Sequence, residues 1–149
     1  MTTGEYSAIA LDLGTTSIKA GLMDHKGVLS NIVAAPAPKI FVTEGHYESD
    51  ALAYAETAES LLNECIVLAG DCKSLGLCSQ RSSFLIWEQA SGLPLTPLIS
   101  WQDNRGAASC AALLMHEEVI RNLTGLPLTP YYFAPKLRVV LQENPEWQA

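Results

Sequence analysis

A short segment near the N-terminus combines residue types that bind phosphate. It reads DLGTTSIK from residue 12 and lies between two apolar runs. Its glycine, Gly14, lets the backbone approach an anion closely, and the N–H and hydroxyl groups of Thr15 and Thr16 offer several donors to phosphate oxygens. The carboxylate of Asp12 could hold a hydrated Mg²⁺ that bridges the phosphates of a nucleotide, and Lys19 would add a positive charge on the same face. The segment therefore predicts a phosphate site.

The same segment also has a purely structural interpretation. An aspartate and a glycine beside two β-branched residues form a stable β-hairpin that needs no ligand. The segment is not a P-loop, because its glycine turn leads into a strand rather than into the N-terminus of a helix. On these residues alone both interpretations stay open, since short motifs often match by chance.

Three apolar segments surround this turn, at residues 6–13, 17–23 and 27–35. They are separated by GTT and DHKG, where glycine supplies the positive φ that tight turns require. This pattern predicts a three-stranded antiparallel meander. The segment APAPK then ends the meander, because proline cannot donate to a β-ladder.

A long helix is predicted over residues 50–69, where apolar residues recur with the i, i+3, i+4, i+7 spacing of a helix face. Ser49 or Asp50 can cap it, since a short side-chain oxygen accepts from an unpaired N–H of the first turn. The rest of the chain predicts strands at 74–79, 84–88 and 97–101 and helices at 103–115 and 130–142. The order of these elements indicates an α/β unit whose mixed sheet begins with the antiparallel meander.

Composition narrows the class of protein. The 149 residues are 48% hydrophobic and 17% charged, which is typical of one globular unit with a real core. The net charge of −7 comes without any Lys/Arg cluster, so no nucleic-acid partner is expected. No apolar stretch is long enough to span a bilayer, and the N-terminus MTTGEYS lacks the features of a signal peptide. We therefore expect a cytoplasmic protein without a membrane partner.

The cysteines and histidines indicate no metal site. Neither a C-x-x-C pair nor a histidine at zinc-ligand spacing accompanies the four cysteines, so reduced, buried thiols are expected. The four are Cys65, Cys72, Cys78 and Cys110. The three histidines show no partner spacing and are assigned no role; they are His25, His46 and His116.

Four segments in order along the chain resemble those of the FGGY carbohydrate kinases, the family of glycerol kinase, xylulokinase and gluconokinase. ALDLGTTSIKAGLMD resembles the family's first phosphate-binding segment, and GHYESDALAYAETAESLL its glycine, acidic pair and long helix. GLCSQRSSFLIWEQASGLPLTPLISWQDNRGA resembles its substrate-loop hairpin and tryptophan segment, and LTGLPLTPYYFAPKLRVVL the segment before its next helix. The likeness covers nearly the whole chain and is greatest to the glycerol-kinase-like branch.

This resemblance implies a fold and a domain organisation. The family has an actin-like, ribonuclease-H-like fold in which two domains close around a cleft, with sugar bound mainly by the first and adenine mainly by the second. Residues 1–149 would be the N-terminal part of the first domain, with the rest of that domain and the second domain absent. The expected cofactors are ATP and Mg²⁺, the expected partner is a small sugar or polyol, and the full-length enzyme could form a homodimer.

The resemblance also implies roles for individual residues. The members of the phosphate segment would face Mg²⁺ and the nucleotide; they are Asp12, Gly14, Thr15, Thr16 and Lys19. Gln80 and Arg81 fall at the family's hydrogen-bonding pair against the polyol, and Trp101 and Tyr131 fall where the sugar pocket is lined. Structural alternatives stay open, because Arg81 and Lys19 could be solvated charges and the two aromatics could be core residues.

Two further positions carry alternatives. Ser82 follows the Gln-Arg pair where glycerol kinase has a glutamate that binds the triol, and the lost carboxylate argues against glycerol itself as the substrate. Asp103 is either a cap at the start of the helix predicted over 103–115 or a contact to the substrate.

The catalytic base of the family is an aspartate in a G-x-x-D segment, and no acidic residue of this chain matches it. The resemblance therefore implies a fragment of an ATP-dependent carbohydrate kinase that is inactive by itself. Two alternatives remain at this point: a non-catalytic sugar- or nucleotide-binding module, and another ATPase of the actin-like superfamily.

Overall fold

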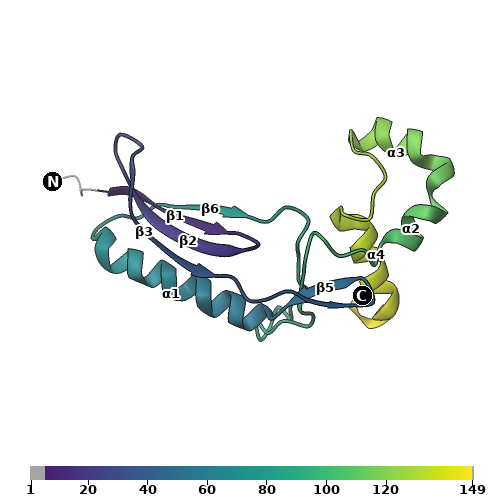
Figure 1. Ribbon diagram of the computed structural model, residues 1–149, viewed down its shortest axis with the longest axis horizontal. Coiled ribbons are helices and arrows are strands. Elements are labelled where there is room, and N and C mark those ends of the chain that lie inside the picture. The colour runs from purple at the N-terminus through teal and green to yellow at the C-terminus, as the bar shows by residue number, and fades with distance from the viewer. Residues whose placement is uncertain (1–5, 149) are drawn as a thin grey trace. The chain divides into compact units, whose positions relative to one another are not determined.

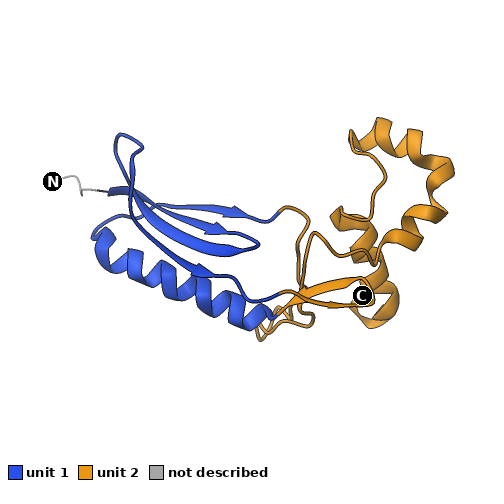
Figure 2. Ribbon diagram, viewed as in Figure 1, with its two compact units in different colours: residues 1–39, 50–80 blue, residues 40–49, 81–149 orange. Residues whose placement is uncertain are grey.

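The structure is a computed structural model that describes residues 6–148 (Figure 1). The described residues form two compact units, where composition predicts one globular unit (Figure 2). Unit 1 consists of residues 6–39 and 50–80, and unit 2 of residues 40–49 and 81–148.

Unit 1 contains a four-stranded mixed sheet with the strand order β3-β2-β1-β6. Its strands are β1 (Tyr6–Leu13), β2 (Ser17–Asp24), β3 (Leu29–Pro36) and β6 (Leu75–Ser79). β2 is antiparallel to both β1 and β3, and β6 is parallel to β1. The predicted meander and the predicted strand at 74–79 are therefore confirmed.

The helix α1 (Ala51–Ala69) packs against β1, β2 and β3, and lies along one face of the sheet (Figure 1). Alternating residues of β2, such as Ile18 and Leu22, are fully buried on this face, as the period of a strand requires. The Asp50 carboxylate accepts from the Ala53 N–H at 3.0 Å, which confirms the predicted helix and cap.

Unit 2 contains a small antiparallel sheet with the order β4-β5-β7. The strands are β4 (Phe41–Thr43), β5 (His46–Ser49) and β7 (Leu98–Ile99). The β4–β5 hairpin was not predicted from the sequence. Its turn is formed by Glu44 and Gly45 with φ of 51° and 87°, a left-handed pair that suits the twist of a two-residue hairpin.

The strand predicted over residues 84–88 is wrong. Only isolated bridges form there, between Phe84 and Ile99 and between Trp87 and Pro94. The Ile86 N–H donates to the Thr96 hydroxyl at 3.0 Å, so a side chain takes the place of a ladder bond at this position. The strand predicted over residues 97–101 is reduced to β7.

The helices of unit 2 are shorter and more numerous than predicted. They are α2 (Ala107–Ala112), η1 (Leu114–His116), α3 (Glu117–Thr124), α4 (Phe133–Glu143) and η2 (Pro145–Gln148). The prediction over residues 103–115 is thus broken into α2 and η1. The helix predicted from residue 130 begins later, because Tyr132 is still extended, and Pro135 rather than Pro130 lies in its first turn.

The cysteines confirm one part of their prediction and contradict another. All four are free thiols, and Cys65 and Cys110 are buried. Cys78 is exposed, because it lies on β6, an edge strand whose residues are all exposed. Within the described part of the chain, no helix is long and apolar enough to cross a bilayer.

Candidate active site

The turn between β1 and β2 is built around a close approach of two backbone segments. A side chain on Gly14 would place its Cβ 2.5 Å from the carbonyl oxygen of Ser17, so no other residue fits without a shift of the backbone. Gly14 does not have the positive φ that was predicted for it; Gly27, in the turn between β2 and β3, does. The glycine of the phosphate segment therefore acts by its small size, which keeps the turn tight.

The structure places Asp12 and Lys19 directly opposite each other on β1 and β2. Both side chains are exposed, as is Thr16, while Thr15 is half-buried. This register places a carboxylate and an ammonium group next to the turn. The exposure of Lys19 fits the solvated-charge alternative and the phosphate interpretation equally well.

Asp12 and Lys19 line an open hollow of about 510 Å³ in unit 1. Every residue of β1 from Ala8 to Asp12 contributes to its lining. Its remaining lining is mostly apolar.

Tyr54 and Gln80 both donate hydrogen bonds to the backbone of the turn between β1 and β2. The Tyr54 hydroxyl of α1 donates to the Gly14 carbonyl at 2.8 Å, and Gln80 Nε2 donates to the same carbonyl at 3.2 Å and to the Tyr54 oxygen at 3.1 Å. Burial raises the pKa of the Tyr54 hydroxyl, the hydrogen bond from Gln80 opposes this, and the charge of Asp12 adds to it. Tyr54 therefore stays protonated and keeps its donor at neutral pH.

Gln80 is thus located at the predicted phosphate turn, and its predicted contact with the sugar remains a prediction. Sequence reasoning missed Tyr54. Tyr54 lies on the apolar stripe of α1, one turn after the cap, so the sequence predicts that its ring is buried. The sequence pattern does not identify the hydrogen-bond partner of its hydroxyl.

Two aromatic side chains of unit 2 lie together at its surface. The ring centroids of Trp101 and Tyr131 are 6.3 Å apart with an angle of 56° between the ring planes. They are 40% and 53% exposed, so the alternative that they are core residues is wrong. Exposed aromatic faces of this kind can cover the C–H face of a sugar.

Arg81 and Ser82, which follow Gln80, belong to unit 2, as does Trp101. The Trp101 N–H donates to Ser83 Oγ at 2.8 Å, which joins the two loops. Ser82 has a φ of 61°, a left-handed conformation that is uncommon for serine and occurs where the surroundings enforce it. Arg81 is exposed, which is consistent with either of its two interpretations.

Asp103 is not the cap of a helix. It is fully buried, and its carboxylate accepts from the Tyr47 N–H at 2.7 Å and from Arg105 Nε at 2.7 Å. α2 begins four residues later, with Gly106 at its N-cap and no side-chain cap. The predicted substrate contact of Asp103 remains a prediction.

Ion pairs of Arg105 with Asp103 and Glu48 account for the buried position of the Asp103 carboxylate. Burial alone would raise the pKa of Asp103, but hydrogen bonds from Arg105 and Tyr47 outweigh it and hold the pKa below its ordinary value. Burial alone would likewise lower the pKa of Arg105, and its bonds to Asp103 and Glu48 raise it. The three charged groups form one network that ties β5 to the loop after β7.

The residues at the turn suit Mg²⁺ held mainly by phosphates and water. Among the described residues, no group of three or more His, Cys, Asp or Glu side chains is arranged to hold a metal ion. Asp12 offers one exposed carboxylate beside the turn. Mg²⁺ in nucleotide sites is usually bound by one or two carboxylates, several waters and the phosphates, so one exposed carboxylate fits such a site.

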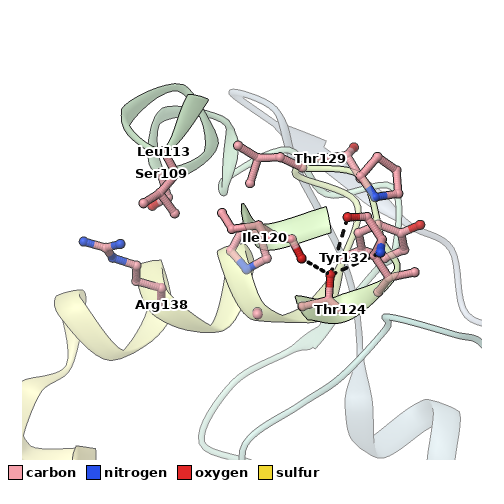
Figure 3. Close-up of a pocket in the computed structure, with 12 residues that line it drawn as sticks. Ser109, Leu113, Ile120, Thr124, Thr129, Tyr132 and Arg138 are labelled. Carbon is pink, nitrogen blue, oxygen red and sulfur yellow. Dashed lines mark hydrogen bonds between the residues drawn. The ribbon is translucent and has the colours of Figure 1, made fainter. Parts of the chain in front are cut away.

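An apolar cavity of about 260 Å³ lies elsewhere in unit 2 and contains none of the predicted site residues (Figure 3). Its lining includes Leu113 of the α2 C-terminus, Ile120 of α3 and Arg138 of α4. Thr124 closes one wall by donating to the Ile120 carbonyl at 2.7 Å.

Residues 7–149 match the model of the FGGY family of carbohydrate kinases, N-terminal domain. The chain therefore belongs to the FGGY family of carbohydrate kinases. Its fold, a mixed sheet that begins with an antiparallel meander and has a helix packed on it, is part of the actin-like domain of these proteins.

Among curated proteins, the chain is similar to the glycerol kinase of Rhodospirillum rubrum, with 36% identity over 143 residues that cover 92% of this chain and 29% of that protein. It is also similar to the glycerol kinase of Haemophilus influenzae, with 35% identity over 147 residues that cover 95% of this chain and 29% of that protein. The chain thus spans less than a third of the length of these relatives.

Solved structures show the same fold. The Plasmodium falciparum glycerol kinase with ADP is similar with a TM-score of 0.81 and 26% identity over 94% of this chain and 30% of that one. The gluconate kinase of Lactobacillus acidophilus has a TM-score of 0.78 at 22% identity and covers 93% of this chain and 29% of that one, which supports the fold alone.

Proposed function

We propose that this chain is the N-terminal part of the sugar-binding domain of an ATP-dependent carbohydrate kinase. The enzyme would transfer the γ-phosphate of ATP to a hydroxyl group of a polyol, ketose or aldonate. The observation that carries this proposal is the β1–β2 turn, in a chain of the FGGY family: Tyr54 donates to the Gly14 carbonyl of the turn, and Asp12 and Lys19 lie opposite each other on the strands beside it. The ADP named with the Plasmodium glycerol kinase structure supports a nucleotide as the ligand.

The turn would act on the phosphates by position and charge. The N–H and hydroxyl groups of Thr15 and Thr16 would donate to phosphate oxygens, and the Lys19 ammonium group would neutralise part of their charge. Bound Mg²⁺ would supply further charge neutralisation, with Asp12 as its protein ligand. Phosphoryl transfer depends mostly on such positioning and electrostatic stabilisation, so these groups would contribute to catalysis at the phosphates of the nucleotide.

The candidate sugar-site residues of unit 2 would select the acceptor. Trp101 and Tyr131 would cover the apolar face of the sugar, and Arg81 would bind its hydroxyl groups. Ser82 carries a hydroxyl where glycerol kinase has a carboxylate, so we expect an acceptor with a hydroxyl pattern different from that of glycerol. A site built for one hydrogen-bonding pattern discriminates strongly against another.

We further propose that residues 1–149 do not catalyse phosphoryl transfer by themselves. None of the acidic residues matches the family's catalytic aspartate, and the relatives extend well beyond the matched part. Part of a cleft positions its reactants poorly, and positioning is most of the rate enhancement.

A coupled ADP-release screen of the native protein that contains this chain tests the proposal. The acceptors would be polyols, ketoses and aldonates, with residues 1–149 alone and a protein-free mixture as references. We expect ADP release with at least one acceptor, and a raised KM for ATP in Lys19→Met. Lys26→Met removes the same charge from an exposed turn and serves as the control. A native protein that releases no ADP with any acceptor would refute the proposal.

A further inference from the structure

Lys136, on α4, is a fully buried lysine with two backbone partners. Its Nζ donates to the Ser82 carbonyl at 2.6 Å and to the Ser100 carbonyl at 2.9 Å, and the side chain is 0% exposed. Burying an ammonium group costs several kcal/mol unless close partners compensate. A methionine of similar length would carry no charge to bury, but it could not donate to the two carbonyl oxygens.

The two carbonyls belong to the two loops that carry the acceptor-site residues. Ser82 is itself one of the candidates and has the left-handed φ of 61°. Ser100 directly precedes Trp101, whose N–H donates to Ser83 Oγ. Lys136 therefore connects the two loops next to the hydrogen bond between Trp101 and Ser83. One of its two acceptors is the carbonyl of Ser82, the residue with the left-handed φ.

The packing of α4 places Lys136 at this junction. A Cβ on Gly106 would lie 2.7 Å from the Pro135 side chain and 3.2 Å from the backbone nitrogen of Lys136. Gly106 therefore lets the first turn of α4 pack directly against the backbone that follows Trp101. Phe84 packs edge-to-face on Phe133 with ring centroids 4.8 Å apart, and its ring centroid lies 6.0 Å from Lys136 Nζ.

We propose that Lys136 is a positioning residue for the sugar site: its buried ammonium group holds the Ser82 loop and the Trp101 loop in the one arrangement that binds the acceptor. This inference rests on the proposed function. Lys136 acts through Ser82 and Ser100 and needs no contact with the substrate. Because all these residues lie in unit 2, the effect should be confined to the acceptor and leave the nucleotide turn of unit 1 unchanged.

The test is a steady-state comparison of the native protein with its Lys136→Met variant, using an acceptor identified in the ADP-release screen. We expect kcat/KM for the acceptor to fall on the order of 10²-fold, mostly through KM, because misplacement by about 1 Å has an effect of that size. KM for ATP should change by less than about twofold. Arg138→Met removes the same charge from an exposed position of the same helix and should behave as the wild type.

Two results would overturn the inference: equal losses in the acceptor and ATP parameters of Lys136→Met, or no loss in either. Lys136→Arg provides a second variant if methionine prevents folding, because it keeps the charge but moves the donors. A positioning role predicts a raised acceptor KM with an unchanged ATP KM in Lys136→Arg. A role limited to charge balance predicts wild-type values and would also overturn the inference.

Failure of the proposed function would be visible separately, because the wild-type protein itself would then release no ADP. In that case, hydrogen exchange at the Trp101 N–H decides whether Lys136 holds the loops. We expect exchange in Lys136→Met to be faster by about tenfold or more, which corresponds to a loss of local stability of about 1.4 kcal/mol. Unchanged exchange would refute the positioning role irrespective of any activity.

Discussion

The buried ammonium group of Lys136 is predicted to make a contribution to the free energy of unfolding that grows as the pH rises from about 8 to 10.5. Burial lowers the pKa of Lys136 from its ordinary 10.5 to about 8; the charge of Asp103 opposes this effect and that of Arg105 adds to it. Between these two values the folded protein has released the proton while the unfolded chain still holds it. Stability rises with pH wherever the unfolded state binds more protons, so the sign of the effect is positive.

The magnitude follows from the same two values. Each pH unit between them contributes at most about 1.4 kcal/mol, so the full gain from pH 8 to 10.5 is about 3 kcal/mol. Asp103 and Arg105, the charged groups that face Lys136, have pKa values shifted away from this range and do not change charge in it.

Other groups act in the opposite direction over the same range. Burial raises the pKa of the Cys65 and Cys110 thiols above their ordinary 9.0, so the folded state keeps those protons longer than the unfolded chain. Their effect lowers stability as the pH rises. A difference measurement against Lys136→Met is therefore needed, because the thiols contribute equally to both proteins.

The assay is guanidinium chloride unfolding of the wild type and of Lys136→Met at intervals from pH 7 to 10.5. The difference in free energy of unfolding should move by about 3 kcal/mol in favour of the wild type over this range. Arg138→Met, from an exposed position, controls for the loss of one positive charge. A difference between wild type and Lys136→Met that does not vary with pH would refute the reasoning.

Three other substitutions test the site. Asp103→Asn should lower the free energy of unfolding by about 3 to 5 kcal/mol, because it leaves Arg105 buried without its main partner; a loss below about 1 kcal/mol in chemical denaturation would contradict this. Tyr54→Phe should cost about 1 kcal/mol and raise KM for ATP but not for the acceptor, and kinetics with both substrates would expose an equal effect on each. Gly14→Ala should cost about 1 to 3 kcal/mol through its collision with Ser17, and an unchanged melting temperature would disprove the close approach.

The elements with a strong local pattern could be predicted from the sequence. The strands of the β1–β2–β3 meander alternate or run apolar, α1 has the apolar spacing of a helix face, and turn glycines or a capping aspartate mark their ends. These signals act within a few residues, so they survive without knowledge of the rest of the fold.

The second half of the chain shows where local patterns fail. The helix predicted from Asp103 begins only at Ala107, because the Asp103 carboxylate binds Tyr47, 56 residues earlier, and Arg105. The strand predicted over 84–88 is interrupted by the bond from Ile86 to Thr96. In both cases a side chain makes a hydrogen bond to a residue of another segment at the place where the regular element was predicted.

The same division applies to the candidate site. The residues of the phosphate turn are neighbours in sequence, and the hairpin that presents them is a local structure, so the sequence by itself determined their grouping. Lys136 lies 54 residues from Ser82 and 36 from Ser100, and an isolated lysine in a helix pattern shows no partner. Only the tertiary structure decided that this ammonium group is buried between two loops, because desolvation and hydrogen bonding depend on what packs around a residue rather than on its neighbours in the chain.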